Sequence, residues 1–280
     1  MTKNQFRKLP ADLNSLVATA GINYDYLVNP AQRLQASPNI GLFILGNNDR
    51  RNRCHILPPT PAARPGRQRR PPSVCGAMYP CSNPELVAAV SEAGGIGIMQ
   101  PISLTYVHGY DFREGIRAIR KLTDKPIGMN ALIEQSSKRY HQRMQQWVDI
   151  ALEEGIRFFV TSLGKPGWVV ERVHAAGGLV YHDTTNRKFA LKGLDDGVDG
   201  LICVNNRAGG HTGQKSAAEL YEELADLNVP LICAGGISTK EDYQHAMQLG
   251  YEGVQMGTAF IATTECSASD AYKQAIIDSQ

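Results

Sequence analysis

The sequence predicts an α/β protein, a (β/α)8 TIM barrel preceded by an irregular N-terminal extension. Three observations predict this fold. From residue 73 onward, short apolar segments of strand length recur, amphipathic stretches of helical length separate them, and each kind occurs eight times. Strict alternation with parallel crossovers gives either an open doubly wound sheet or a closed barrel. Eight units favour the barrel.

The expected strands are rich in Val, Ile, Leu, Phe and Met, which is typical of strands buried on both faces. The eight strands are Ser73–Met78, Ile96–Met99, Ile127–Leu132, Phe158–Leu163, Gly178–Asp183, Gly200–Val204, Pro230–Gly235 and Gly253–Met256. The eight expected helices are Asn83–Ala93, Asp111–Leu122, Lys138–Glu154, Gly167–Ala176, Thr185–Asp196, Ser216–Leu227, Lys240–Leu249 and Ser269–Ser279. For the first helix, Ser82 or Asn83 can cap the N-terminus and Pro84 suits the first turn.

The chain divides near residue 72 into an N-terminal extension, residues 1–72, and a barrel domain, residues 73–280. Residues 50–72 contain seven arginines, six prolines and no acid. Such a composition cannot pack into a core, so we expect a surface loop or a disordered linker. A basic run can also mark nucleic-acid binding, but this one has no interleaved aromatics and no recognisable fold, which favours the linker.

The bulk composition is that of an ordinary soluble protein, with 42% hydrophobic and 20% charged residues. A net charge of +2 gives no general reason to expect nucleic acid or acidic membranes as partners. No apolar stretch approaches the length of a membrane span, and the first residues lack the apolar region of a signal peptide. The six cysteines form no CxxC pair and no cluster with zinc spacing. We therefore expect a cytoplasmic protein with reduced thiols and no metal. The oligomeric state stays open.

Glycines follow the last two expected strands, where barrels frequently bind phosphate. One strand ends in Ala234-Gly235-Gly236, and the other continues from Gln255-Met256 into Gly257-Thr258. Glycine lets backbone N–H groups approach a phosphate closely. The alternative is that these glycines only form tight turns between strand and helix. Their occurrence after both strands favours a phosphate-bearing ligand, whose identity does not follow from position.

His211 follows the sixth expected strand, in a loop with Gly209 and Gly210 before it and Gly213 after it. In this fold the residues after each strand line the active site. Histidine titrates near neutral pH, so it can take a proton from a carbon acid or support an anionic substrate. The alternative is a surface histidine whose glycines serve turn geometry alone, and position does not decide between them.

A set of short motifs lies on and after the expected strands. Three blocks are A-G-G-H-T-G at 208–213, C-A-G-G-I at 233–237 and Q-M-G-T-A-F at 255–260. Three earlier segments are A-M-Y-P-C-S-N-P-E-L at 77–86, A-G-G-I-G at 93–97 and T-D-K-P-I-G-M-N at 123–130. In content and order this set resembles the nitronate monooxygenase family, and the similarity spans about residues 75–278.

This resemblance implies a noncovalent FMN and oxidation of a small nitronate or nitroalkane by O2, giving a carbonyl compound and nitrite. His211 matches the family's catalytic histidine, as a base or an anion-orienting group. Ala77 and Met78 would lie beside the flavin, and Asn130 would reach its ring. The implied cofactor-binding residues are Ala77, Met78, Asn130, Gly209, Gly210, Ala234, Gly235, Gly236, Gln255, Met256, Gly257 and Thr258, of which Gly235, Gly236, Gly257 and Thr258 would hold the phosphate.

Two rival functions stay open. One is an NAD(P)H-dependent flavin reductase of the enoyl-acyl-carrier-protein or quinone reductase type, and the other is a non-catalytic truncated remnant. The sequence also departs from the family where many members carry Q-G-x-E, because residues 204–207 read Val-Asn-Asn-Arg. A glutamine that would contact flavin is absent at Val204, with Asn205 or Asn206 as substitutes, and Arg207 replaces the acid.

Other polar residues near strand ends have more than one interpretation. His182-Asp183 has the composition of a metal pair, but without partner ligands at useful spacing a supporting role is favoured. The loop at 100–110 lines a substrate pocket or packs on the surface, and the sequence does not distinguish these. Ser162 and Lys165 are further candidates to approach the flavin or substrate. His141 and His174 fall on helical faces and are expected at the surface.

Overall fold

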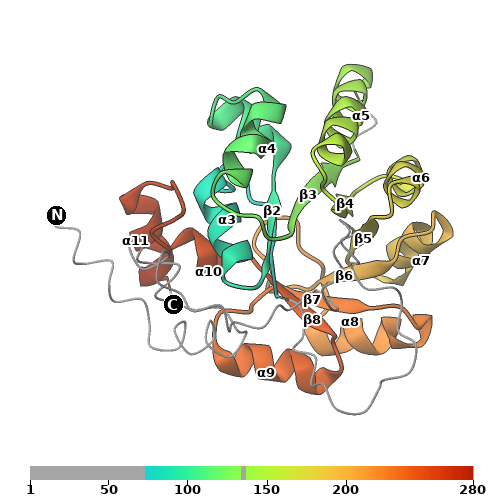
Figure 1. The fold of residues 1–280 in the computed structure, drawn as a ribbon. Helices are drawn as coiled ribbons and strands as arrows, with labels where there is room; N and C mark the ends of the chain where they lie inside the picture. The colour runs from blue at the N-terminus through green and yellow to red at the C-terminus, as the bar shows by residue number, and fades with distance from the viewer. Residues whose placement is uncertain (1–72, 134–136, 280) are drawn as a thin grey trace, which may run out of the picture.

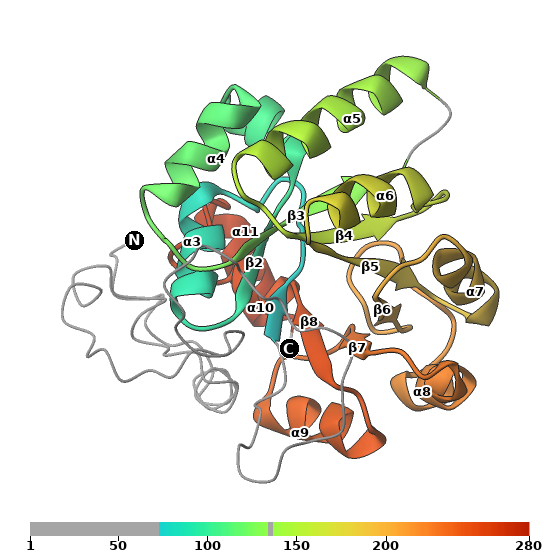
Figure 2. The same cartoon turned by 45° about the vertical axis from the view of Figure 1, so that its right-hand side comes forward.

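The computed structural model describes residues 73–133 and 137–279, and in it eight parallel strands close into a barrel. Each strand pairs with the next one along the chain, and β8 pairs with β1, so the sheet has no free edge. Figures 1 and 2 show the helices following one another around the strands in chain order. The expected TIM barrel is confirmed. The N-terminal extension, with its Arg/Pro-rich segment 50–72, lies outside the described residues, and the domain boundary at residue 72 stays a prediction.

All eight expected strands form, and the ends of four differ by one to three residues. The strands are β1 (Ser73–Cys75), β2 (Ile96–Met99), β3 (Ile127–Leu132), β4 (Phe158–Ser162), β5 (Leu179–Thr184), β6 (Gly200–Val204), β7 (Leu231–Ala234) and β8 (Gly253–Met256). The largest difference is at β1, which ends at Cys75 and not at Met78. The next residue, Gly76, still donates its N–H to the carbonyl oxygen of Met256 at 2.9 Å, so β8 guides the chain past the strand's end.

The eight expected helices also form, each within two or three residues of its expected ends. They are α3 (Pro84–Glu92), α4 (Phe112–Arg120), α5 (Lys138–Glu153), α6 (Gly167–Ala175), α7 (Arg187–Asp195), α8 (Ala217–Leu224), α9 (Lys240–Leu249) and α11 (Asp270–Asp278). A 3-10 turn, η4 (Ala225–Leu227), continues α8 over the last three residues of the expected helix. Two short elements were not expected: a π-helix, η3 (Ser103–Val107), and a one-turn helix, α10 (Thr258–Ile261). No helix in the described ranges is long and apolar enough to cross a membrane.

Successive side chains of each strand point to opposite faces of the sheet, so they enter two separate apolar clusters. One cluster fills the barrel, and the other lies between the strands and the surrounding helices. The inner cluster is Val74, Ile96, Ile98, Phe158, Val160, Ile202, Ile232 and Ala234. All five described cysteines are buried free thiols. The barrel is therefore a packed core, and its chemistry belongs at its mouth.

Two caps show how local sequence begins the helices. At α9, Thr239 is the N-cap and forms a capping box with Asp242, each side chain accepting from the other's backbone N–H. At α3, Asn83 occupies the cap position but makes no capping bond. Its side chain instead donates to the carbonyl oxygen of Glu265 at 2.8 Å and accepts from the N–H of Ser267 at 3.0 Å. The start of α3 is thereby joined to the chain after β8.

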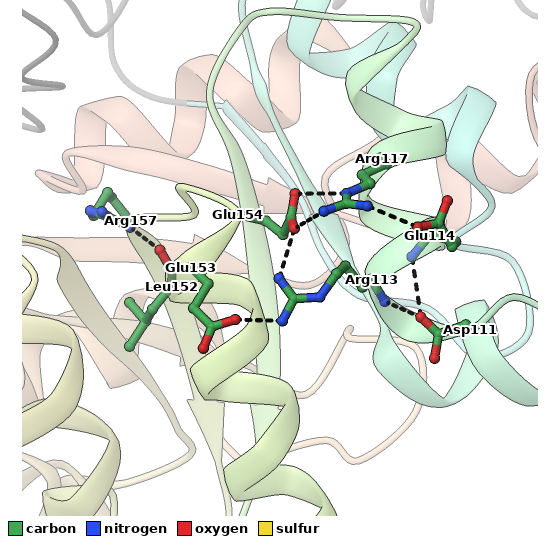
Figure 3. A network of polar contacts seen from close by, with 8 residues as sticks. All are labelled: Asp111, Arg113, Glu114, Arg117, Leu152, Glu153, Glu154 and Arg157. Carbon is green, nitrogen blue, oxygen red and sulfur yellow. Dashed lines mark hydrogen bonds and ion pairs between the residues drawn. The ribbon is translucent and has the colours of Figure 1, made fainter.

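Ion pairs connect α4 to the end of α5 (Figure 3). Arg113 pairs with Glu153 and Glu154, and Arg117 pairs with Glu154 and Glu114. Hydrogen bonds from the two arginines hold the pKa of Glu154 below its usual range. The arginines are solvent-accessible, so salt screens these pairs and their contribution to stability is small.

Gly97 sets how closely α3 approaches β2. A Cβ added at Gly97 would lie 2.2 Å from the backbone oxygen of Val87 on α3. We therefore expect Gly97→Ala to push α3 away and lower the free energy of unfolding by about 1–3 kcal/mol or more, the usual effect of overpacking.

Gly167→Ala is the matched control, because an added Cβ there meets its nearest atom, on Asp196, at an ordinary 3.4 Å. Thermal and urea unfolding of both variants measures the difference. Equal stability of the two variants would show that α3 moves to accommodate the added methyl group without lowering the free energy of unfolding.

Candidate functional site

The loops after β6, β7 and β8 meet at the mouth of the barrel. Three close approaches between backbone glycines and neighbouring loops define the meeting point. A Cβ on Gly209 would lie 3.1 Å from Thr258 Oγ1, one on Gly235 would lie 2.5 Å from Asn205 Oδ1, and one on Gly236 would lie 2.6 Å from Arg207 Nε. The structure therefore brings together three motifs that are separate in the sequence, through Gly209, Thr258 and the Gly235-Gly236 pair.

The turn after β7 needs glycine on conformational grounds as well. Gly235 and Gly236 have φ values of 113° and 68°, in the left-handed region that side chains disfavour. Among the described residues, the N–H groups of Gly235, Gly236, Gly257 and Thr258 donate to no other residue. The glycines thus serve turn geometry and also leave unpaired donors at two neighbouring strand ends. Such a group of donors suits the oxygens of a phosphate.

Asn205 joins the loop after β6 to the turn after β7. Its side chain is buried, with Nδ2 donating to the carbonyl oxygen of Gly235 at 2.9 Å and Oδ1 accepting from the N–H of Arg207 at 2.8 Å. Both the nitrogen and the oxygen of this amide are hydrogen-bonded inside the protein, whereas the Asn206 side chain is exposed. Val204, where many family members have glutamine, packs against the apolar interior of the barrel.

Arg207 brings a positive charge to the glycine turn. Its guanidinium lies against Gly236 and 3.5 Å from Asp242, the capping-box partner of Thr239 at the start of α9. Burial opposes ionisation of Asp242, but hydrogen bonds from Ser238 and Thr239 outweigh it and lower the pKa of this carboxyl. The side chain of Arg207 is 66% exposed, so the cation remains available to an anion at the turn.

The inner wall carries several of the predicted residues. Asn130 on β3 is 9% exposed and faces the interior, one position beyond the outward-facing Met129. Gln255 also faces inward, with its side chain over Gly76, and its carbonyl oxygen Oε1 is buried without a partner among the described residues. Met256 differs from these two, because its side chain packs into the outer core behind the strand.

Two predicted residues after β1 also lie at this mouth. Ala77 packs on the inner cluster. The sulfur of Met78 lies 3.2 Å from the position of a Cβ on Gly257. Residues 76–78, which were expected to belong to the first strand, are therefore a loop, and Met78 contacts the start of α10.

His211 lies on the exposed rim of the mouth. It makes no hydrogen bond with another described residue, and the preceding Gly210 has a φ of 98° with nothing within 4 Å of an added Cβ. The His211 side chain can therefore reorient without breaking a hydrogen bond to a described residue. In the sequence, His211 lies two residues beyond Gly209.

His182 and Asp183 point to opposite sides of β5. His182 faces outward, where its Nδ1 lies 2.9 Å from Thr161 Oγ1 and burial lowers the imidazole pKa to about 4. Asp183 faces the barrel interior, and burial raises its pKa to about 7. Adjacent residues of one strand cannot ligate one metal from opposite faces, and no group of metal-binding side chains occurs within the described ranges. His182 and Asp183 therefore have different surroundings, and the supporting role expected of this pair stays a prediction.

Four large apolar side chains in the segments that follow strands are exposed. Tyr106 and Val107 belong to η3, in the loop whose role the sequence left open, and Tyr79 and Leu163 follow β1 and β4. Leu163 has a φ of 60°, which is strained for a non-glycine residue. Ser162 and Lys165 flank this turn, the first half-buried and the second exposed. These exposed groups are suited to contact an apolar part of a ligand.

The two histidines expected at the surface lie on helix faces. His174 is exposed and pairs with Asp199, with 2.9 Å between Nε2 and Oδ2. His141 is half-buried and packs edge-on against Trp168. Neither belongs to the barrel mouth.

Comparisons with known proteins agree with this architecture. The family model for nitronate monooxygenase matches residues 68–280. A (3aS,4S,5R,7aS)-5-hydroxy-7a-methyl-1-oxo-octahydro-1H-indene-4-carboxyl-CoA dehydrogenase of Rhodococcus jostii is 30% identical over 193 residues, which are 69% of this chain and 52% of that protein. A probable nitronate monooxygenase of Staphylococcus saprophyticus is 29% identical over 252 residues, covering 75% of this chain and 70% of that protein.

Among solved structures, FabK from Thermotoga maritima superposes with a TM-score of 0.64 and 29% identity, covering 72% of this chain and 63% of that chain. The chain thus spans between about half and two thirds of the length of several relatives that it matches.

The Asn205 contact generates a stability prediction. Asn205→Asp replaces the donor to Gly235 with an oxygen that faces a carbonyl oxygen in a buried position. We expect the free energy of unfolding near neutral pH to fall by about 1–3 kcal/mol, the effect of leaving a buried acceptor unpaired. The exposed neighbour provides the control, since Asn206→Asp should change stability by less than about 0.5 kcal/mol. Similar losses in the two variants would mean that the loop does not depend on the Asn205 amide.

Proposed function

The chain belongs to the nitronate monooxygenase family, and from this we propose that it is an FMN-dependent oxidoreductase that oxidises small nitronates or nitroalkanes with O2, giving a carbonyl compound and nitrite. The observation that carries the proposal is a set of four backbone N–H groups, the glycine cradle, at Gly235, Gly236, Gly257 and Thr258. They have no partner among the described residues and lie where barrels bind phosphate. Such a cradle fits the single terminal phosphate of FMN.

The other residues at the mouth also fit this cofactor. Arg207 supplies a cation beside the turn that would hold the phosphate. Asn130 and the unpaired Gln255 oxygen offer hydrogen-bonding groups to a polar ring. Ala77 and Met78 provide an apolar contact for a flat aromatic system. FMN bound there would supply the electron acceptor for substrate oxidation.

His211 would act on the substrate from the rim. A neutral nitroalkane must lose a proton from carbon before it is a nitronate, and an imidazole can accept that proton. Protonated His211 can then orient the anion. The glycines around it leave the loop free to bring the ring over the mouth, and the exposed Tyr106, Val107 and Leu163 would contact the alkyl part and limit water.

A second candidate function uses the same scaffold for NAD(P)H-dependent reduction, of the enoyl-acyl-carrier-protein or quinone reductase type. The likeness to FabK and to a dehydrogenase acting on a CoA ester supports it. Anaerobic mixing distinguishes the two candidates: bleaching of flavin by a nitronate favours oxidation, whereas bleaching by NADH or NADPH alone favours the reductase.

The first experiment is an absorbance spectrum of the purified chain. We expect flavin bands that stay with the protein on gel filtration and leave on denaturation as FMN and not FAD, because the cradle suits one terminal phosphate. A colourless protein that cannot be reconstituted with FMN would overturn the proposed function and leave the non-catalytic alternative.

The role of His211 is tested by His211→Asn. We expect FMN to stay bound, while flavin reduction by a neutral nitroalkane slows by about 10²-fold or more, the usual effect of losing a general base. A pre-formed nitronate needs no deprotonation, so its turnover should suffer less if the residue acts only as a base. His245→Asn, at an exposed site on α9, is the control. Unchanged rates on both substrates would exclude a catalytic role for His211.

A further inference from the structure

The register of the barrel sorts its inward-facing residues into layers. Side chains from alternate strands share a layer, four to a layer, because the pairing shifts by about one residue per strand. Val74 on β1 pairs with Ile96 on β2 and with Gln255 on β8. When the registers are followed around the barrel from Val74, inward-facing residues of β1, β3, β5 and β7 lie at the same height along the barrel axis. The layer nearest the mouth on these strands consists of Gly76, Asn130, Asp183 and Ala234.

Asp183 is the charged residue of that layer. Two and four positions earlier on β5, Tyr181 and Leu179 pack on the inner cluster, which fixes the inward direction of this face. Its layer partner Asn130 was implied by resemblance to reach the flavin. The remaining partners, Gly76 and Ala234, have little or no side chain. The opening above this layer is therefore bordered by polar groups on β3 and β5.

The carboxyl of Asp183 has no bonding partner within the part of the chain that the structure describes. Its Oδ1 is buried without a hydrogen bond, and no lysine or arginine there forms an ion pair with it. On its own strand the nearest titratable groups are Tyr181 on the same face and His182 on the other. From β6 the nearest is Cys203, which faces the outer core, and β4 presents Val160 and Ser162, which do not titrate near neutral pH.

A buried polar atom without a partner is rare in native proteins and is often found at functional sites. Gln255 Oε1, which also has no partner in the described ranges, lies in the layer directly below, and the Gln255 side chain lies over Gly76. Two unpartnered oxygens on the same interior surface point to one missing ligand. Because burial without a cation raises the pKa of Asp183 to about 7, its carboxyl is neutral below that pH and can donate a hydrogen bond.

Accepting the proposed function, we propose that Asp183 is a cofactor-contacting residue whose protonated carboxyl donates a hydrogen bond to the pyrimidine ring of the bound flavin, beside Asn130. Ionisation of Asp183 removes this donor and leaves a negative charge in the barrel mouth. FMN binding therefore requires the proton, and the affinity falls as the pH rises above neutrality.

The test is FMN titration of the apoprotein, followed by fluorescence quenching, from about pH 6 to about pH 8.5. For a contact that requires protonation of a group with a pKa of about 7, the wild-type Kd should rise by about tenfold or more over this range. Asp183→Asn keeps a donor and cannot ionise, so its Kd should change only through the phosphate of FMN itself. The ratio of the two Kd values cancels that shared contribution.

Two further variants complete the design. Asp183→Val removes the donor and should bind FMN weakly at every pH. Asp195→Asn removes an equal charge from the exposed face of α7 and should keep the wild-type pH profile. The wild-type protein alone gives a second readout: calorimetry at about pH 8 in buffers of different ionisation enthalpy should detect uptake of up to about one proton with FMN.

The outcomes separate the two proposals. If wild-type protein and Asp183→Asn bind FMN with the same pH profile and calorimetry finds no proton uptake, Asp183 does not contact the flavin, and the proposed function stands. If no variant and no preparation binds FMN, both proposals fail. A pH-dependent Kd ratio together with proton uptake supports the contact, whichever substrate the enzyme oxidises or reduces.

Discussion

Closure of the sheet on itself is the constraint on which the rest of this structure depends. Because β8 pairs with β1, every strand has two neighbours and none can shift without displacing the others. Parallel pairing places all carboxyl ends at one mouth, and the period of two sends alternate side chains inward. The glycine cradle, the polar layer and the His211 rim are consequences of this one arrangement.

The fold could be predicted from the sequence because it depends on repeating patterns of apolar and polar residues. Apolar runs of strand length and amphipathic stretches of helix length are visible in one chain, and both were placed within a few residues. The missed elements have a common reason. The π-helix η3 and the single-turn α10 are too short to show a period, and they depend on tertiary contacts such as Met78 against Gly257.

The site was only partly predictable for a different reason. Glycine motifs mark sharp turns and close approaches of the backbone, so Gly235, Gly236 and Gly257 could be singled out from the sequence. The direction of a side chain depends on register, and register is a property of pairs of strands. Met256 thus faces the outer core although it sits inside a recognisable motif. Asp183 was considered beside His182, its neighbour in sequence, whereas the barrel places it in the layer of Asn130.

The bond from Asn205 to Gly235 has a consequence for how this protein can change. The loop that carries His211 and the turn that would hold the phosphate share one buried amide. Substitutions in residues that share a contact are not additive. A substitution in the loop after β6 therefore changes which substitutions the turn after β7 tolerates. The two segments must evolve together. A library that randomises one loop while keeping the other would sample mostly incompatible pairs.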